Sequence, residues 1–194
     1  MPKLLVIIGS TRPERIGLPI GRWFADFAQT HGTFEVEVAD LKEINLPLLD
    51  EPQHPRLGQY QHEHTIQWSG HVNRADAIAM VIPEYNYSMT APVKNALDYL
   101  YHEWCYKPLA LVSYGGASGG LRAAQMVKQV ATTLKMMPLP EGVSIPFAVQ
   151  HLKAGTFEAT DTVRQAAQAM LDELGRWEKA LRQLRESQRQ TSTK

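Results

Sequence analysis

Hydroxyl and guanidinium side chains gather directly after an apolar run at residues 4–8. The segment reads Gly9-Ser10-Thr11-Arg12-Pro13-Glu14-Arg15-Ile16-Gly17 and leads into an amphipathic stretch. A helix N-terminus attracts anions, and arginine offers phosphate a planar, charge-assisted fork. Because Gly-x-Gly-x-x-Gly and Gly-Lys-Ser/Thr are both missing, the segment favours a phosphate monoester over a dinucleotide or a P-loop ligand. A solvated loop with incidental arginines is the other interpretation.

A second segment combines aromatic and polar side chains after another buried run. It reads Pro83-Glu84-Tyr85-Asn86-Tyr87-Ser88-Met89-Thr90. Backbone amides here could bond the edge of a flat heterocycle, with a tyrosine against its surroundings. The alternative is a helix N-cap with two surface tyrosines.

A third segment is rich in glycine. It reads Ser113-Tyr114-Gly115-Gly116-Ala117-Ser118-Gly119-Gly120 and follows a third buried run. Glycines at a strand end have a cost in conformational entropy, but they let backbone approach a ligand closely. A flexible connector is the alternative, and the position of the segment favours the ligand.

The elements that position these segments alternate along the chain. We expect strands at residues 4–8, 34–39, 75–82, 109–114 and 143–149, and helices at 16–29, 57–72, 91–101, 121–134 and 163–184, the third capped by Thr90. This order predicts an α/β fold with one doubly wound sheet, as a single domain over residues 1–187 with a polar tail at 188–194. Ligands of such sheets bind beyond the carboxyl ends of the strands. The three segments therefore predict one cleft, with a phosphate at one end and a flat ring at the other, which is the shape of FMN.

Composition narrows the class of protein. The chain has 194 residues, a formal net charge of zero and one cysteine. The neutral balance argues against nucleic-acid partners, and no apolar run approaches the ~20 residues that span a bilayer. A single cysteine excludes an internal disulfide and fits a reducing compartment. We therefore expect a cytoplasmic protein that does not bind membranes and has no signal peptide.

The three segments, together with Lys94-Asn95-Ala96-Leu97-Asp98, resemble the NADPH-dependent FMN reductase family over roughly residues 4–180. That family includes quinone, chromate and azo-dye reductases. The resemblance implies a flavodoxin-like three-layer fold with a five-stranded parallel sheet in the order 2-1-3-4-5. It also implies bound FMN, NADPH or NADH as electron donor, and a homodimer or homotetramer with FMN near the subunit interface.

Site residues follow from the same resemblance. Ser10, Arg12, Arg15, Ile16 and Gly17 would hold the phosphate; Pro83, Glu84, Tyr85, Asn86 and Tyr87 would line one side of the ring, and Ser113, Gly115, Gly116 and Gly119 another. Many members carry a serine where this chain has Arg15, so Arg15 either replaces that contact or points to solvent or to the nicotinamide nucleotide. No side chain is expected to act as an acid, base or nucleophile, because the flavin carries the chemistry.

Several other residues favour structural roles. His62 and His64 are two residues apart and do not share a helical face, so we expect a solvated helix and no metal site. Cys105 fits a packed thiol. Tyr99, Tyr101 and Trp104 fit either the core or, as the family favours, a subunit interface. Arg182, Arg185 and Arg189 are interpreted as a solvated helix face.

Two further functions compete with the reductase. A flavodoxin-type electron carrier would bind FMN without a substrate pocket, and the neutral charge counts against it. A phosphate-ester or nucleotide enzyme would use the first segment without flavin. The reductase would pass two electrons from NAD(P)H to a quinone, a flavin, an azo compound or a metal oxyanion by a ping-pong mechanism.

Overall fold

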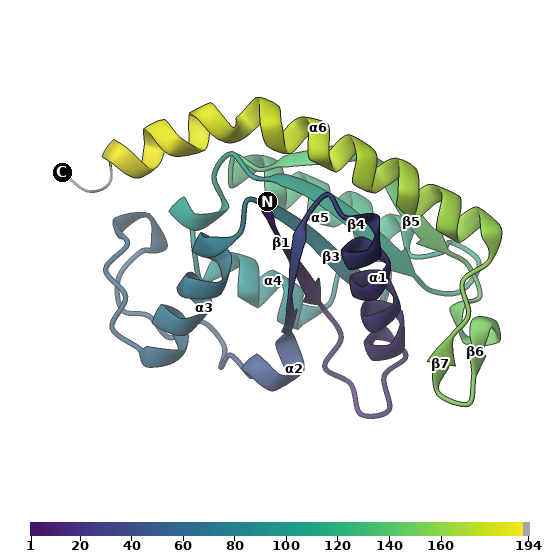
Figure 1. The fold of residues 1–194 in the computed structure, drawn as a ribbon. Coiled ribbons are helices and arrows are strands. Elements are labelled where there is room, and N and C mark those ends of the chain that lie inside the picture. The colour runs from purple at the N-terminus through teal and green to yellow at the C-terminus, as the bar shows by residue number, and fades with distance from the viewer. Residues whose placement is uncertain (192–194) are drawn as a thin grey trace.

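The computed structural model describes the backbone of residues 1–191 and the side chains of residues 1–187. A parallel sheet lies between two layers of helices (Figure 1). Its strands are β1 (Lys3–Ile8), β2 (Glu35–Asp40), β3 (Ala77–Pro83), β4 (Pro108–Tyr114) and β5 (Met137–Ile145), in the order β2-β1-β3-β4-β5. The helices are α1 (Gly17–His31), α2 (Leu41–Ile44), α3 (Glu63–Arg74), α4 (Ala91–Asp98), α5 (Leu121–Thr133) and α6 (Asp161–Thr191). The predicted doubly wound fold and its strand order are confirmed.

The central strands are apolar on both sides because helices cover both faces of the sheet. In β1, Leu5 and Ile7 pack in the core beneath α3, α4 and α5, whereas Leu4 and Val6 pack beneath α1 and α6. In Figure 1, α6 runs along the whole of one layer. The result is a stiff sheet whose carboxyl edge holds loops from several strands in place.

Thr90 joins two of the predicted loops. Its hydroxyl accepts a hydrogen bond from the Val93 N–H at 3.4 Å, as expected for the N-cap of α4. The same hydroxyl donates to the Gly9 carbonyl at 2.7 Å. The confirmed cap therefore also ties the start of α4 to the loop after β1.

Several element boundaries differ from the prediction, and two of these differences have a clear local cause. The helix expected from residue 57 begins at Glu63, because residues 55–57 form a separate 3₁₀ turn that ends at Gly58 with φ of 63°. The strand expected at 143–149 begins at Met137 and ends at Ile145. Pro146 then removes a backbone donor and Phe147 takes φ of 47°, so the chain turns away. A small hairpin, β6 (Leu152–Lys153) with β7 (Thr156–Phe157), follows and was not predicted.

Two expectations about side chains are wrong. Tyr99 and Trp104 are fully buried within this chain, so they belong to the core and not to an exposed interface patch. Arg185 is also buried, and pairs with Glu178, which lies two turns earlier on the same face of α6. A long arginine side chain can reach the core side of α6 when a carboxylate meets it there. Cys105 is buried, as predicted.

The polar tail predicted at 188–194 begins within α6, which continues to Thr191. The side chains of 188–191 and all of 192–194 lie outside the described residues. The predicted exposed face at Arg189 falls on one of these side chains. Among the residues that the structure describes, no helix combines the length and apolar character needed to cross a bilayer. Over the same residues, no group of three or more His, Cys, Asp or Glu side chains is placed to hold a metal ion.

Candidate flavin site

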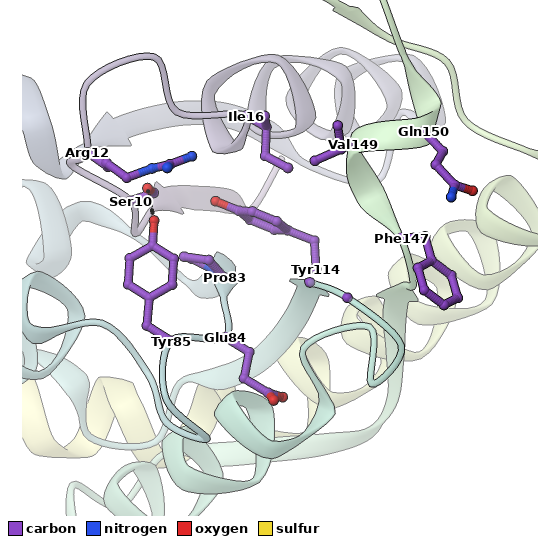
Figure 2. Close-up of a pocket in the computed structure, with 12 residues that line it drawn as sticks. Ser10, Arg12, Ile16, Pro83, Glu84, Tyr85, Tyr114, Phe147, Val149 and Gln150 are labelled. Atoms are coloured by element: carbon purple, nitrogen blue, oxygen red, sulfur yellow. Dashed lines mark hydrogen bonds between the residues drawn. The ribbon is translucent and has the colours of Figure 1, made fainter.

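A cavity of about 310 Å³ opens at the carboxyl ends of β1, β3 and β4 (Figure 2). All three predicted loops contribute to it, together with a fourth segment that follows β5. Its lining residues are Ser10, Arg12, Ile16, Pro83, Glu84, Tyr85, Tyr114, Gly115, Gly116, Phe147, Val149 and Gln150. The structure thus brings together residues separated by up to 140 positions, as the topology requires.

The N-terminus of α1 forms one end of this cavity. Ile16 stands at the N-cap without a side-chain hydrogen bond, and the first turn holds no acidic residue. The first amide N–H groups of a helix have no partners within the helix. With Ser10 buried beside them and Arg12 at the rim, these amides favour a bound anion.

Arg15 points into the protein and not to solvent. Only 5% of its side chain is exposed, and its Nη2 forms an ion pair with the Asp40 carboxylate at the end of β2. The Asp40 carboxylate also accepts the Lys42 N–H at 3.0 Å, so it is held from both sides. Nε and Nη1 of Arg15 are buried and have no hydrogen-bond partner among the described residues. A buried guanidinium with two unused donors fits an anionic ligand.

Two tyrosine hydroxyls converge on Ser10. The Tyr85 Oη lies 3.1 Å from the Ser10 Oγ, within hydrogen-bond distance. The Tyr114 ring lies across the middle of the cavity with its hydroxyl directed toward the same serine (Figure 2). Sequence reasoning placed Tyr85 against a ring and did not select Tyr114. The last residue of a buried strand, where side chains alternate, was the signal that could have found it.

The loop 83–88 is a tight turn. Tyr85 and Ser88 exchange N–H···O bonds of 3.0 Å each, while Asn86 and Tyr87 take φ of 49° and 69°. Positive φ at a bulky residue is strained, and such strain concentrates at functional sites. Tyr87 is 70% exposed and lies under the Arg122 guanidinium, 4.0 Å from its ring centroid. Asn86 and Tyr87 therefore form the outer rim beside the cavity and do not line it.

Glu84 clamps this turn to the glycine loop. Its carboxylate accepts hydrogen bonds from the Arg122 side chain at 2.6 Å, the Ser118 hydroxyl at 2.9 Å and the Arg122 N–H at 3.0 Å. Burial opposes the charged form, but these bonds outweigh it and lower the pKa of Glu84 below its ordinary value of 4.5. Glu84 is therefore an ionised positioning group and not a proton donor.

The glycine loop has an inner and an outer part. Gly115 and Gly116 line the cavity. Gly119 lies beneath them with φ of 60°, and a Cβ there would stand 2.2 Å from the Ser144 Oγ. The Ser113 hydroxyl donates to the Gly119 carbonyl at 2.9 Å. Ser113 and Gly119 thus shape the loop from below, outside the cavity lining.

The segment after β5 was missed as part of the site. Phe147, Val149 and Gln150 line the cavity, and the backbone of this segment is tied to the glycine loop. The Phe147 N–H bonds the Gly116 carbonyl at 3.0 Å, and the next N–H bonds the Gly115 carbonyl at 3.1 Å. Pro146, inside a run interpreted as strand, was the available signal.

The lining of the cavity combines two features that match FMN. The uncapped start of α1 and the Tyr114 hydroxyl, which is buried without a hydrogen-bond partner among the described residues, suit a phosphate. Pro83, Phe147 and Val149 give the lining an apolar wall, with Gly116 among them, where a Cβ would meet no atom within 4 Å. A flat apolar ring fits such a wall, so the residues present fit the cofactor.

Comparison with known proteins supports this fit to a flavin cofactor. An NAD(P)H-dependent FMN reductase from Schizosaccharomyces pombe is 44% identical over 141 residues, which cover 72% of this chain and 70% of the relative. A quinone reductase from Pseudomonas putida is 30% identical over 183 residues, covering 90% and 93%. Among solved structures, the flavoenzyme NAD(P)H:(acceptor) oxidoreductase FerB from Paracoccus denitrificans superimposes with a TM-score of 0.72 at 21% identity, over 93% of this chain and 98% of that one. This structural likeness supports the flavodoxin-like fold.

The model of the NADPH-dependent FMN reductase family matches residues 2–150, which include every segment of the cavity. The chain therefore belongs to the NADPH-dependent FMN reductase family and is an oxidoreductase that uses FMN and NAD(P)H.

Proposed function

We propose that the protein holds FMN in this cavity and passes two electrons from NAD(P)H to a small acceptor. The observation that carries the proposal is the convergence, in one cavity, of the uncapped α1 N-terminus with Ser10, Arg12 and the buried Tyr114 hydroxyl, which has no partner among the described residues. Ser10, Arg12, Arg15 and the amides of residues 15–17 would hold the phosphate. Pro83, Glu84, Tyr85, Gly115 and Gly116 would hold the ring. Asn86, Tyr87, Ser113 and Gly119 would act through the shape of their loops.

Bound FMN would supply the redox chemistry by which NAD(P)H gives up a hydride and an acceptor such as a quinone gains two electrons and two protons, the second proton coming from solvent. The chain's part is to orient the ring and keep one side of it reachable. Glu84 holds the loops 83–88 and 115–120 at a set separation through Arg122 and Ser118. Phe147 and Val149 are exposed by 52% and 69%, so they border the open side where donor and acceptor would stack.

One open side implies that donor and acceptor take turns. We propose a ping-pong mechanism with a quinone as the favoured acceptor, because the Pseudomonas putida relative is a quinone reductase. A free flavin, an azo compound or a metal oxyanion would also fit an open rim. A flavodoxin-type carrier is the second candidate, but the exposed apolar residues at the rim of the cavity and the reductase relatives favour a small-molecule substrate.

Assembly, location and domain organisation belong to the same proposal. A homodimer or homotetramer would cover the exposed Tyr87 ring at the outer rim and leave Phe147 and Val149 open to the substrates. One cysteine and an uncharged balance fit the cytoplasm, without nucleic-acid or membrane partners. Residues 1–187 would form one domain.

The test is steady-state oxidation of NADPH and NADH by the FMN-loaded protein with a benzoquinone. Parallel double-reciprocal lines are expected across acceptor concentrations. Loaded protein that is reduced by NADPH yet turns over only with a protein acceptor would support the carrier instead. Protein that is colourless and binds no FMN would exclude both.

A further inference from the structure

We propose that Tyr114 makes the site select a phosphorylated flavin, by donating a hydrogen bond from its buried hydroxyl to the phosphate of FMN. This inference rests on the proposed function and adds a residue that determines specificity. It is carried by the position of the hydroxyl and by its lack of a partner.

The Tyr114 side chain lines the cavity and is 3% exposed. Its hydroxyl is buried and makes no hydrogen bond of normal geometry to the described residues. Buried polar groups in folded proteins nearly always have a partner, and the exceptions call for an explanation. A ligand atom that completes the site is such an explanation.

The hydroxyl lies against the start of α1. A Cβ built on Gly17, the first residue of that helix, would stand only 2.2 Å from the Tyr114 Oη. Figure 2 shows the hydroxyl directed to the side of the cavity that holds Ser10 and Arg12. It therefore points to the same uncapped N-terminus that favours an anion.

The groups around this hydroxyl make it a donor. Burial raises the pKa of Tyr114 above its ordinary value of 10.0, and the influences of Ser10, Arg15 and Arg12 that lower it do not reverse the shift. The hydroxyl consequently keeps its proton at neutral pH. Two arginines supply positive charge beside it, and a neutral donor between them suits one more phosphate oxygen.

Riboflavin carries the same ring and ribityl chain as FMN but no phosphate. A donor that serves only the phosphate should discriminate between the two flavins, whereas a donor to the chain or the ring should not. The Tyr114→Phe variant keeps the ring that fills the cavity and removes only the hydroxyl.

The experiment measures the Kd of FMN and of riboflavin for the flavin-free protein, by quenching of flavin fluorescence. In Tyr114→Phe we expect FMN to bind 10-fold to 100-fold more weakly, as for a hydrogen bond to a charged group, and riboflavin to bind within twofold of the wild type. Tyr106→Phe, the same change just before β4 at the opposite edge of the sheet, is the matched control and should alter neither Kd.

The position of the Tyr114 hydroxyl against Gly17 can also be tested without flavin. Gly17→Ala should lower the free energy of unfolding in urea, because the new Cβ would collide with the hydroxyl, and the loss should be smaller in a Tyr114→Phe background. Equal losses in both backgrounds would overturn the placement of the hydroxyl.

The remaining outcomes separate this inference from the proposed function. A wild-type protein that binds neither flavin defeats the proposed function itself. If the wild type binds FMN but Tyr114→Phe binds it equally well, or loses FMN and riboflavin to the same extent, the phosphate role of Tyr114 is overturned while FMN binding stands.

Discussion

Two buried arginines lie at opposite edges of the sheet, and they differ in how many of their donors have partners. Arg185, below the amino ends of β3 and β4, donates to the Glu178 carboxylate at 2.5 Å and to the Tyr106 carbonyl at 3.2 Å. Arg15, at the carboxyl edge, has Asp40 and leaves two donors without partners among the described residues. A buried charge that meets its carboxylate and backbone carbonyls serves the fold, whereas unused donors at the edge where ligands bind indicate a site.

The largest effect is expected when the ion pair of Arg185 with Glu178 at the amino edge is broken. Glu178→Ala leaves Arg185 buried without its carboxylate and should lower the free energy of unfolding by about 3–5 kcal/mol. Urea denaturation measures this loss. Glu178→Leu with Arg185→Met is the control and should recover most of it, because well-packed apolar residues replace such pairs with little cost. A small effect of Glu178→Ala would show that this edge does not depend on the pair.

The second prediction concerns the carboxyl edge. Arg12 is exposed at the rim, so Arg12→Ala should leave unfolding in urea nearly unchanged. Loss of a charge-assisted bond to phosphate should weaken FMN binding by about 10-fold to 100-fold. Fluorescence titration measures the Kd, with Arg22→Ala on the outer side of α1 as control. An unchanged Kd would refute the phosphate role of Arg12.

Asp40→Asn should sharpen the comparison between the two arginines. Removing the carboxylate beside Arg15 should cost about 1–2 kcal/mol of stability in the flavin-free protein. With saturating FMN the cost should shrink, because the phosphate would supply the negative charge that Arg15 has lost. Thermal unfolding with and without FMN gives both values. An equal cost in the two states would show that Arg15 does not face the phosphate.

The smallest effect concerns Glu84 and depends on pH. Because its pKa is lowered in the folded state, its contribution to stability is present above the ordinary carboxyl pKa and is lost as pH falls through the folded value. Glu84→Gln should therefore cost less than about 1 kcal/mol at pH 7, and the difference from the wild type should narrow below pH 4.5. Urea denaturation at pH 7 and pH 4 measures both. A gap that widened in acid would contradict the lowered pKa.

The sequence predicts the fold well because its signals are local and repeated. Strands buried on both faces appear as continuous apolar runs, and the helices between them are amphipathic. The segment 57–72 was harder, since a 3₁₀ turn and a helix have similar apolar spacing over so few residues. The burial of Arg185 could not be foreseen, because it depends on Glu178 and on the start of β4 meeting in three dimensions.

The site residues also divide into those that the sequence predicts and those that depend on contacts in three dimensions. Ser10, Arg12, Tyr85 and Gly116 lie where a loop after a strand must lie, so topology places them in the cavity. Phe147 and its neighbours were missed because a strand was extended through Pro146. The ion pair of Arg15 with Asp40 joins β2 to the loop after β1, and no spacing rule reports such a contact.

The backbone of the segment after β5 is anchored through main-chain bonds to the glycine loop, and its side chains take no part in that anchoring. Phe147 and Val149 can therefore vary without disturbing the architecture that supports them. Combined substitutions at these two positions are therefore the first to test for activity with bulkier acceptors. Under the proposed function, substitutions there would change which acceptor is used while the residues that would hold FMN stay in place.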